Sequence, residues 1–209
     1  MSVRRVSVPF ERLPAWLDGF AARHGDPVWT VSADEVHIAG TDGAQAWLDV
    51  PFPPLTAGEG DARERLLAHV SRDRTVGVLL VRRGGHAAGV FAGTELIASK
   101  VDTRYVQGST KAGGWSQQRF ARRRANQSKA AFADAADVAV RVLLPHREVL
   151  DALVCGGDRA AIDAVLGDAR LAALRPLRIG GLLATPDPRL KVLQAAPQQF
   201  RSVRIRLDP

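Results

Sequence analysis

Three runs of strand-like composition between residues 75 and 106 constrain the fold more than any other feature of the chain. They read TVGVLLVRR, HAAGVFAG and ELIASKVDTRYV, and the pairs Gly84-Gly85 and Gly93-Thr94 separate them. Apolar and β-branched residues bounded by glycine are typical of strands, and short glycine turns join antiparallel neighbours. The pattern predicts a three-stranded meander.

A change of hydrophobic period follows the predicted meander. After a glycine-rich loop over 107–118, apolar residues recur at helical spacing for about seven turns. The members of this stripe are Phe120, Ala121, Ala125, Phe132, Ala136, Ala139, Val140 and Leu143. We predict a long basic helix over 115–143, which ends before Pro145.

The N-terminal quarter of the chain has its own pattern. A helix is expected over 10–24, then two or three antiparallel strands in VWTVSADEVHIAGTDGAQAWLDVPF, with a tight Asp-Gly turn, and another helix over about 61–73. We interpret residues 1–55 as a small subdomain of one helix and short strands. Residues 56–209 are then the main domain.

The C-terminal third continues the alternation of strands and helices. It contains a buried strand, VLDALVCGG, then a helix, DRAAIDAVLG, with Asp158 as its expected N-cap. A short helix, RLKVLQAAPQQF, and a last strand, SVRIRL, complete the chain. Interleaved strands and helices predict an α/β (α+β) fold in which helices pack on a mixed β-sheet.

Length and composition indicate a folded chain. Its 209 residues suffice for one ample core or two small ones, and 46% of them are apolar. No apolar run approaches the roughly 20 residues of a membrane-spanning helix, and the N-terminus lacks the pattern of a secretion signal. Cys155 is the single cysteine, which excludes a disulfide within the chain. We expect a cytoplasmic monomer that does not bind a membrane.

The charge excess of the chain is concentrated in one segment. Between Asp102 and Asp134 there are seven Lys or Arg residues and no carboxylate, and the formal net charge of the whole chain is also +7. A local patch of this size predicts a polyanionic partner, because neutralised phosphates release counterions. The alternative is a basic helix face that interacts only with solvent.

The usual catalytic and metal-binding sets are not apparent. The five histidines are scattered without metal-ligand spacing, and Cys155 at the end of a predicted strand is better interpreted as a buried structural thiol. The CGGD turn places a carboxylate beside any incoming phosphate, so nucleotide binding there is only a third hypothesis. The acid-free segment lacks the clustered carboxylates of a metal-dependent nuclease. We expect no cofactor and no metal.

The segment GGWSQQR, residues 113–119, is the remaining candidate site. Glutamine does not titrate, so it cannot be a general base, but it can orient a water through hydrogen bonds. The glycines allow the backbone to enter a narrow space. Arg119 and Arg123, one helical turn apart, are suited to holding RNA phosphates. Such a loop can act where another molecule supplies the remaining geometry.

This segment resembles the catalytic loop of eukaryotic and archaeal class I release factors. It is closer to the Vms-type peptidyl-tRNA hydrolases of ribosome-associated quality control, which carry Gly-x-x-Gln in place of Gly-Gly-Gln. The matching residues are Gly114-Trp115-Ser116-Gln117. The motifs GGWSQQRFARRRANQ, LVCGGDR and APQQFRSVRIRL resemble the actinobacterial members of this Vms-like group. The resemblance covers most of the chain and implies a fold like the catalytic domain of eukaryotic-type class I release factors.

The resemblance also implies an activity, the rescue of stalled large ribosomal subunits by a peptidyl-tRNA hydrolase. In such proteins the loop enters the peptidyl-transferase centre, and here Gln117 would place a water against the ester of peptidyl-tRNA. Gly113 and Gly114 would shape the loop, and Gln118 is the alternative to Gln117 because a second glutamine departs from the family pattern. No segment for reading stop codons is apparent in the 209 residues, which favours rescue over ordinary termination.

The expected partners are the ribosomal RNA of the large subunit and peptidyl-tRNA. A contact with RNA would use the cations of the acid-free segment, which are Arg104, Lys111, Arg119, Arg122, Arg123, Arg124 and Lys129. The alternative from another functional class is a non-catalytic ribosome- or RNA-binding factor that uses the same basic patch.

Overall fold

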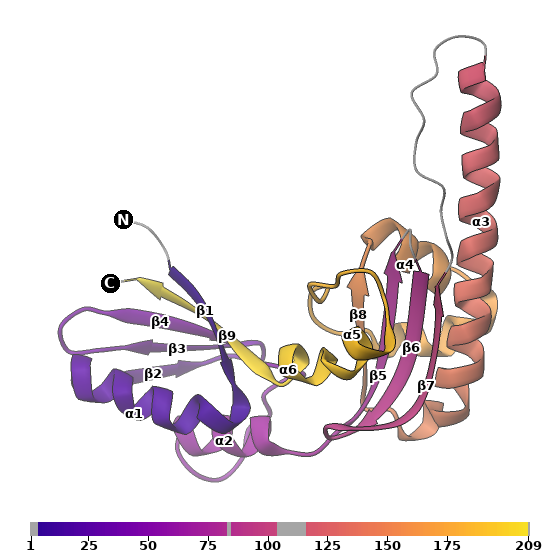
Figure 1. Ribbon diagram of the computed structural model, residues 1–209. Helices are drawn as coiled ribbons and strands as arrows, with labels where there is room; N and C mark the ends of the chain where they lie inside the picture. Colours follow the sequence, from indigo (N-terminus) through magenta and orange to yellow (C-terminus); the bar gives the residue numbers. More distant parts are fainter. Residues whose placement is uncertain (1–3, 83–84, 104–115, 209) are drawn as a thin grey trace. The chain divides into compact units, whose positions relative to one another are not determined.

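A computed structural model shows a chain of two compact units (Figure 1). The structure describes residues 4–82, 85–103 and 116–208, and for residues 103 and 116–128 it describes the backbone only. The first unit comprises Met1–Asp73 and Pro197–Pro209, and the second comprises Arg74–Ala196. Each unit has its own sheet and its own hydrophobic core.

The first unit is built on a five-stranded antiparallel sheet in the order β1-β9-β4-β3-β2. Buried and exposed residues alternate along β3 and β4, as expected for strands with one face in the core. The strands are β1 (Arg4–Pro9), β2 (Val28–Val31), β3 (Glu35–Ala39), β4 (Gln45–Asp49) and β9 (Ser202–Asp208).

Two helices pack into the core of this first sheet. After the turn η1 (Phe10–Arg12), α1 (Leu13–His24) ends at Gly25, whose φ of 76° suits glycine. A capping box starts α2 (Ala62–Ser71), because Asp61 and Glu64 accept hydrogen bonds from each other's backbone N–H groups. The short helix α6 (Ala196–Phe200) leads into β9.

The second unit contains a mixed sheet in the order β7-β6-β5-β8. The strands β5 (Thr75–Arg82), β6 (Gly85–Ala92) and β7 (Glu95–Thr103) form the predicted antiparallel meander. Strand β8 (Ala152–Gly157) pairs in parallel with β5, which requires a long crossover between them. This mixed sheet with packed helices confirms the predicted fold class.

The helices of the second unit cover both faces of its sheet (Figure 1). On one face, α3 (Ser116–Leu143) and α4 (Arg159–Leu166) share a core with alternate residues of β5 and β6. On the other face, Leu193 of α5 (Leu190–Gln194) packs against Gly89 of β6. The 3-10 segments η2 (Leu144–Val149) and η3 (Ala169–Leu177) follow α3 and α4.

The boundary between the units differs from the one expected at residue 55. Helix α2 buries Leu66 and Val70 in the core of the first unit, so that unit continues to Asp73. Strand β9 also belongs to it, because β9 lies between β1 and β4. Alternation within SVRIRL predicts a strand but not its partners, since pairing between the two ends of a chain is non-local.

Close packing explains the Gly156-Gly157 turn after β8. A Cβ atom on Gly157, whose φ is 102°, would collide with the carbonyl oxygen of Val81, and one on Gly156 would collide with the hydroxyl of Thr185. These contacts explain the two glycines by close packing, without a bound phosphate. Nucleotide binding at this turn stays a hypothesis, which a thermal shift with nucleotides would test. Asp158 occupies the predicted N-cap position of α4, but its side chain makes no capping hydrogen bond with the helix.

Replacing Gly157 with alanine is expected to destabilise the second unit by about 2–4 kcal/mol, because backbone strain and the collision with Val81 act together. Gly180→Ala is the matched control, since Gly180 has a φ of 63° but no neighbouring atom within 4 Å of its Cβ position. Strain alone should cost this variant about 1 kcal/mol. Urea unfolding measures both losses, and equal losses would contradict the packing explanation.

Candidate functional site

The predicted catalytic segment leads into the N-terminal end of α3. The helix observed over Ser116–Leu143 agrees with the helix predicted over 115–143, and Gln117 and Gln118 fall in its first turn. Gly113 and Gly114 lie outside the described residues. The backbone of α3 therefore brings the two candidate glutamines together at one helix end.

The predicted RNA-binding cations lie partly on the same helix. Arg119 and Arg122–Arg124 belong to the first three turns of α3, where only the backbone is described. Lys129 has a described side chain, and it is exposed. Arg104 and Lys111 lie outside the described residues.

The N-terminal half of α3 rises beyond the ends of the four strands of its unit (Figure 1). From Lys129 on, where the side chains are described, Phe132 is the first residue that packs against the core, and Ala135 and Ala136 are the first that are fully buried. The thirteen residues 116–128 that precede Lys129 span about 20 Å at 1.5 Å per residue. The backbone at Gln117 thus projects from the second unit.

The C-terminal half of α3 anchors the helix. Its buried residues are Ala135, Ala136, Val138, Ala139, Val142 and Leu143. Three members of the predicted apolar stripe are among them, and Phe132 and Val140 are partly buried against the same core. The side chains of Phe120, Ala121 and Ala125 lie outside the described part, so the first half of the stripe stays a prediction.

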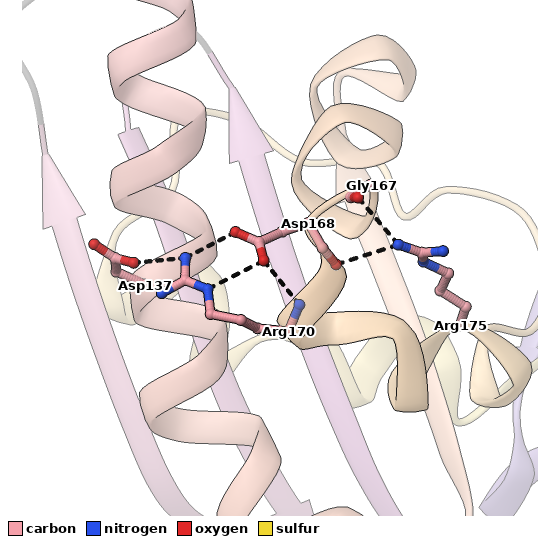
Figure 2. A network of polar contacts seen from close by, with 5 residues as sticks. All are labelled: Asp137, Gly167, Asp168, Arg170 and Arg175. Carbon is pink, nitrogen blue, oxygen red and sulfur yellow. Dashed lines mark hydrogen bonds and ion pairs between the residues drawn. The ribbon is translucent and has the colours of Figure 1, made fainter.

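A polar network joins the anchored half of α3 to the turn after α4 (Figure 2). Arg170 donates through Nη2 to Asp137 of α3 at 2.8 Å and to Asp168 at 2.7 Å. Its Nε lies 3.1 Å from the other carboxylate oxygen of Asp168, which also accepts the backbone N–H of Arg170 at 2.9 Å. One guanidinium therefore links α3 to the first residues of η3.

Arg175 stabilises the backbone of this same turn (Figure 2). It donates to the carbonyl oxygens of Leu166, Gly167 and Asp168 at 2.6, 3.0 and 3.2 Å. Carbonyl groups at the end of a helix have no partner within the helix, so a guanidinium there satisfies acceptors that would otherwise need water. The side chains of Arg170 and Arg175 therefore both bind the turn that carries Asp168.

The contact with Arg170 lowers the pKa of Asp168 to about 2, first through the side-chain hydrogen bond and then through the backbone N–H. The side-chain hydrogen bonds to Asp168 and then to Asp137 raise the pKa of Arg170. A carboxyl group whose pKa falls on folding stabilises the folded state above its unfolded pKa of about 4. That stabilisation is lost as the pH falls from about 4 to about 2.

We therefore expect the stability of the second unit to decline over this acidic range in part through Asp168. In Asp168→Asn, which cannot titrate at this position, the decline should be smaller. In an Arg170→Met background the same substitution should reduce the decline much less, because the guanidinium hydrogen bond is the largest cause of the lowered pKa and only the backbone N–H of residue 170 remains as a donor there. Chemical unfolding at a series of pH values measures this, and an equal effect of Asp168→Asn in both backgrounds would contradict the assignment.

An open groove lies between α3 and the end of α4. Its volume is about 420 Å³, and its lining is mostly small and apolar. The lining residues are Lys129, Phe132, Ala133 and Ala136 of α3, with Ala164, Gly167 and Asp168 across from them. The two helices are therefore not closely packed along this stretch.

Other reactive groups in the described residues offer little alternative chemistry. Burial raises the pKa of the Cys155 thiol to about 12, which makes it a poor nucleophile at neutral pH and agrees with a structural role. Among the described residues, no group of three His, Cys, Asp or Glu side chains could hold a metal ion. No helix in that part of the chain is long and apolar enough to cross a membrane.

Sequence reasoning missed the polar network. Asp137 interrupts the alanine-rich stretch of α3, and Asp168 and Arg170 are close in sequence, but Asp137 and Asp168 are 31 positions apart. No local pattern indicates that these two carboxylates share one guanidinium. Only the packing of α4 beside α3 brings them together.

The family comparison matches the whole of the second unit. The family described as "Actinobacteria/chloroflexi VLRF1 release factor" matches residues 74–206. This match begins at Arg74, the first residue of the second unit, and continues into β9. No curated protein matches the sequence significantly.

Comparison with solved structures gives alignments at low sequence identity. The "Vms1 mitochondrial localization core" aligns with a TM-score of 0.50 and 10% identity, over 81% of this chain and 75% of that chain. An archaeal translation termination factor, aRF1, aligns with a TM-score of 0.42 and 15% identity, over 78% of this chain and 51% of that chain. The first likeness concerns the fold alone, and the second is weaker.

The family match decides the relationship that the sequence motifs suggest. It covers well over half of the 209 residues and contains the whole of α3, with the Gly114–Gln117 segment before and within its first turn. The predicted resemblance is confirmed at the level of the family. The chain belongs to the Actinobacteria/chloroflexi VLRF1 release factor family.

Proposed function

We propose that this protein is a peptidyl-tRNA hydrolase that frees nascent chains from stalled large ribosomal subunits. The observation that carries the proposal is the position of Gln117 in the first turn of α3, at the end that projects from the second unit (Figure 1). The family supports the same activity, since its members are described as release factors. The Gly-x-x-Gln pattern, which resembles that of the Vms-type hydrolases, supports action on stalled subunits.

The shape of the projecting helix suits a site inside another particle. A single helix about 10–12 Å wide can enter a passage that the sheet of the second unit cannot. The roughly 20 Å between Lys129 and the helix end supplies the reach. Gly113 and Gly114 can adopt backbone conformations that other residues avoid, so the tip can follow the walls of a narrow centre.

The charge of the helix suits an RNA environment. No acidic residue lies in the first turn of α3, and Arg119 and Arg122–Arg124 follow at once. The aligned peptide dipoles place about half a positive charge at the same helix end. Helix end and arginines together would attract the phosphates of ribosomal RNA and of peptidyl-tRNA, the two partners that we propose.

The proposed reaction is hydrolysis of the ester between the nascent peptide and the ribose of the tRNA. The side-chain amide of Gln117 accepts a hydrogen bond from a water and holds it against the ester carbonyl carbon. A bond forms between the water oxygen and this carbon, and the bond to the ribose oxygen breaks. The ribose oxygen gains a proton, so the peptide leaves as a free acid and the tRNA keeps a free hydroxyl.

Glutamine cannot take up the proton of the attacking water, because its amide does not titrate near neutral pH. The proton must therefore pass through groups of the ribosomal centre or of the tRNA itself. In this proposal the protein contributes position, and the ribosome contributes the remaining chemistry. The stalled subunit completes the active site, so one copy of the protein would suffice. We propose that it acts as a monomer in the cytoplasm, where its ribosomal partner lies.

The charge of α3 also favours the alternative, a non-catalytic factor that binds ribosomal RNA. Isolated large subunits that carry labelled peptidyl-tRNA distinguish the two roles. A hydrolase liberates the peptide, whereas a binding factor associates in a salt-sensitive manner and releases nothing. Stable binding without any release would reject the hydrolase and leave the binding factor.

A further inference from the structure

The direction of α3 decides where its N-terminal end lies. Among the side chains of α3 that the structure describes, Phe132 is the first that packs against the core. Gln117 precedes Asp137 by 20 residues, which is about 30 Å along the helix. A tilt of about 10° at the anchored end would move Gln117 by about 5 Å. A reaction that depends on the placement of a water cannot tolerate such a displacement.

The packing between α3 and α4 leaves room for a tilt. Where the two helices face each other, Ala133 and Ala136 lie opposite Ala164 and Gly167 across the open groove. Such small side chains interlock weakly, because ridges that fit into grooves fix the angle between helices. The apolar contacts with α4 therefore do little to fix the angle of α3 on this side, although α3 also packs on β5 and β6.

Arg170 makes a polar contact that crosses from η3 to α3 beside this groove (Figure 2). Asp168 holds its guanidinium through Nε at 3.1 Å and Nη2 at 2.7 Å, and the same Nη2 reaches Asp137 at 2.8 Å. Arg175 fixes the carbonyl groups of the turn that presents Asp168. The guanidinium is thus held by a hydrogen-bonded turn and binds α3 at Asp137, next to Ala136 in the lining of the groove.

We propose that Arg170 is a positioning residue that holds α3 at the angle its N-terminal end requires. The structural role of Arg170 rests on this geometry. The catalytic consequence of that role rests on the proposed function. The side chains of Arg170 and Asp137 are 50% and 56% exposed, so the pair adds little to stability. It selects instead among neighbouring tilts of a helix that the core already holds. A planar guanidinium suits this task because it binds two carboxylates at once, which an ammonium does less well.

Pulsed electron paramagnetic resonance between two spin labels tests the structural part. One label is placed by Ala121→Cys on the projecting half of α3, and the other by Ser99→Cys at an exposed position of β7. Cys155 is buried and stays unlabelled in the native protein. In Arg170→Met, the distance distribution should shift or broaden by about 3–5 Å relative to the unsubstituted parent. An unchanged distribution in a folded Arg170→Met protein would overturn the proposal.

Arg178→Met provides the matched control. It removes an arginine of the same unit whose Nη1 lies 2.6 Å from Asp163 of α4, a contact that does not involve α3. The spin-label distribution should remain that of the parent. A change as large as that in Arg170→Met would show that any lost ion pair loosens the unit, which would contradict a specific role for Arg170.

Peptide release on large subunits tests the catalytic consequence. Arg170→Met should lower the single-turnover release rate by about tenfold while binding to the subunit is kept, and Arg170→Lys should recover only part of the rate. If the release rate of Arg170→Met fell by no more than the fraction of that variant that is unfolded, the result would contradict a positioning role for Arg170. If the parent protein releases no peptide at all while the distribution still responds to Arg170→Met, the proposed function fails and the structural role of Arg170 stands.

Discussion

Replacing Gln117 with alanine is expected to slow peptide release from peptidyl-tRNA by at least about 100-fold. The side chain is proposed to hold the attacking water, and the loss of such positioning is worth several kcal/mol of barrier. Affinity for the large subunit should not change, because the variant keeps every cation of α3. Single-turnover release at saturating protein measures the first quantity, and cosedimentation with large subunits measures the second.

Gln118→Ala is the matched control, because it removes the same side chain from the next position in the first turn of α3. Its release rate should stay within about threefold of the parent, since the water is held by its neighbour. The opposite pattern would assign the water to Gln118, the alternative that the doubled glutamine leaves open. Full activity in both variants would contradict any role for glutamine.

The second large effect is expected from reversing two charges on α3. Arg122→Glu combined with Arg123→Glu should weaken binding to large subunits by about two to three orders of magnitude at low salt. Lost phosphate contacts and new repulsion both contribute to this loss. The slope of the logarithm of affinity against the logarithm of salt concentration should also become shallower by about two, one for each lost phosphate contact. A salt titration followed by fluorescence anisotropy of labelled protein measures both quantities.

The matched control for this variant changes the net charge equally at another place. Arg189 and Lys191 are exposed residues at α5, which packs on the face of the sheet opposite α3. Arg189→Glu combined with Lys191→Glu should reduce affinity only modestly, through the long-range field of the protein. Equal losses in both double variants would show that net charge, and not a contact made by α3, governs binding.

Local sequence patterns predicted most of the fold because they reflect local physics. The meander over 75–106 combines strand composition with glycine turns, and all three strands occur in order. The helical stripe that ends at Leu143 predicted α3 to within one residue at its start. Each of these elements depends on residues that are close in sequence.

Elements whose partners lie far away in the chain could not be predicted in the same way. The alternation in SVRIRL marks β9 as a strand, but its place between β1 and β4 depends on the two ends of the chain meeting. Helix α2 was assigned to the main domain because its own sequence does not indicate the core that receives Leu66. These two contacts shift the boundary between the units to Asp73.

The candidate site also has a part that is local in sequence and a part formed by distant residues. The glutamines and arginines of α3 are recognisable from sequence because they lie together in one short segment. The network of Asp137, Asp168 and Arg170 is not, because it forms only when α4 and η3 pack beside α3. The residues proposed to perform the reaction lie in one segment of the sequence. The residues proposed to position that segment come from distant parts of the chain.

Hydrolysis by water is the central claim, and peptide release in ¹⁸O-labelled water tests it most directly. Purified protein is added to isolated large subunits that carry peptidyl-tRNA, and the released peptide is analysed by mass spectrometry. We predict a free peptide whose carboxyl group carries one ¹⁸O atom, formed with the parent protein and not with Gln117→Ala. Peptide that stays attached to tRNA although the protein binds the subunit, or released peptide without the isotope, would contradict the account.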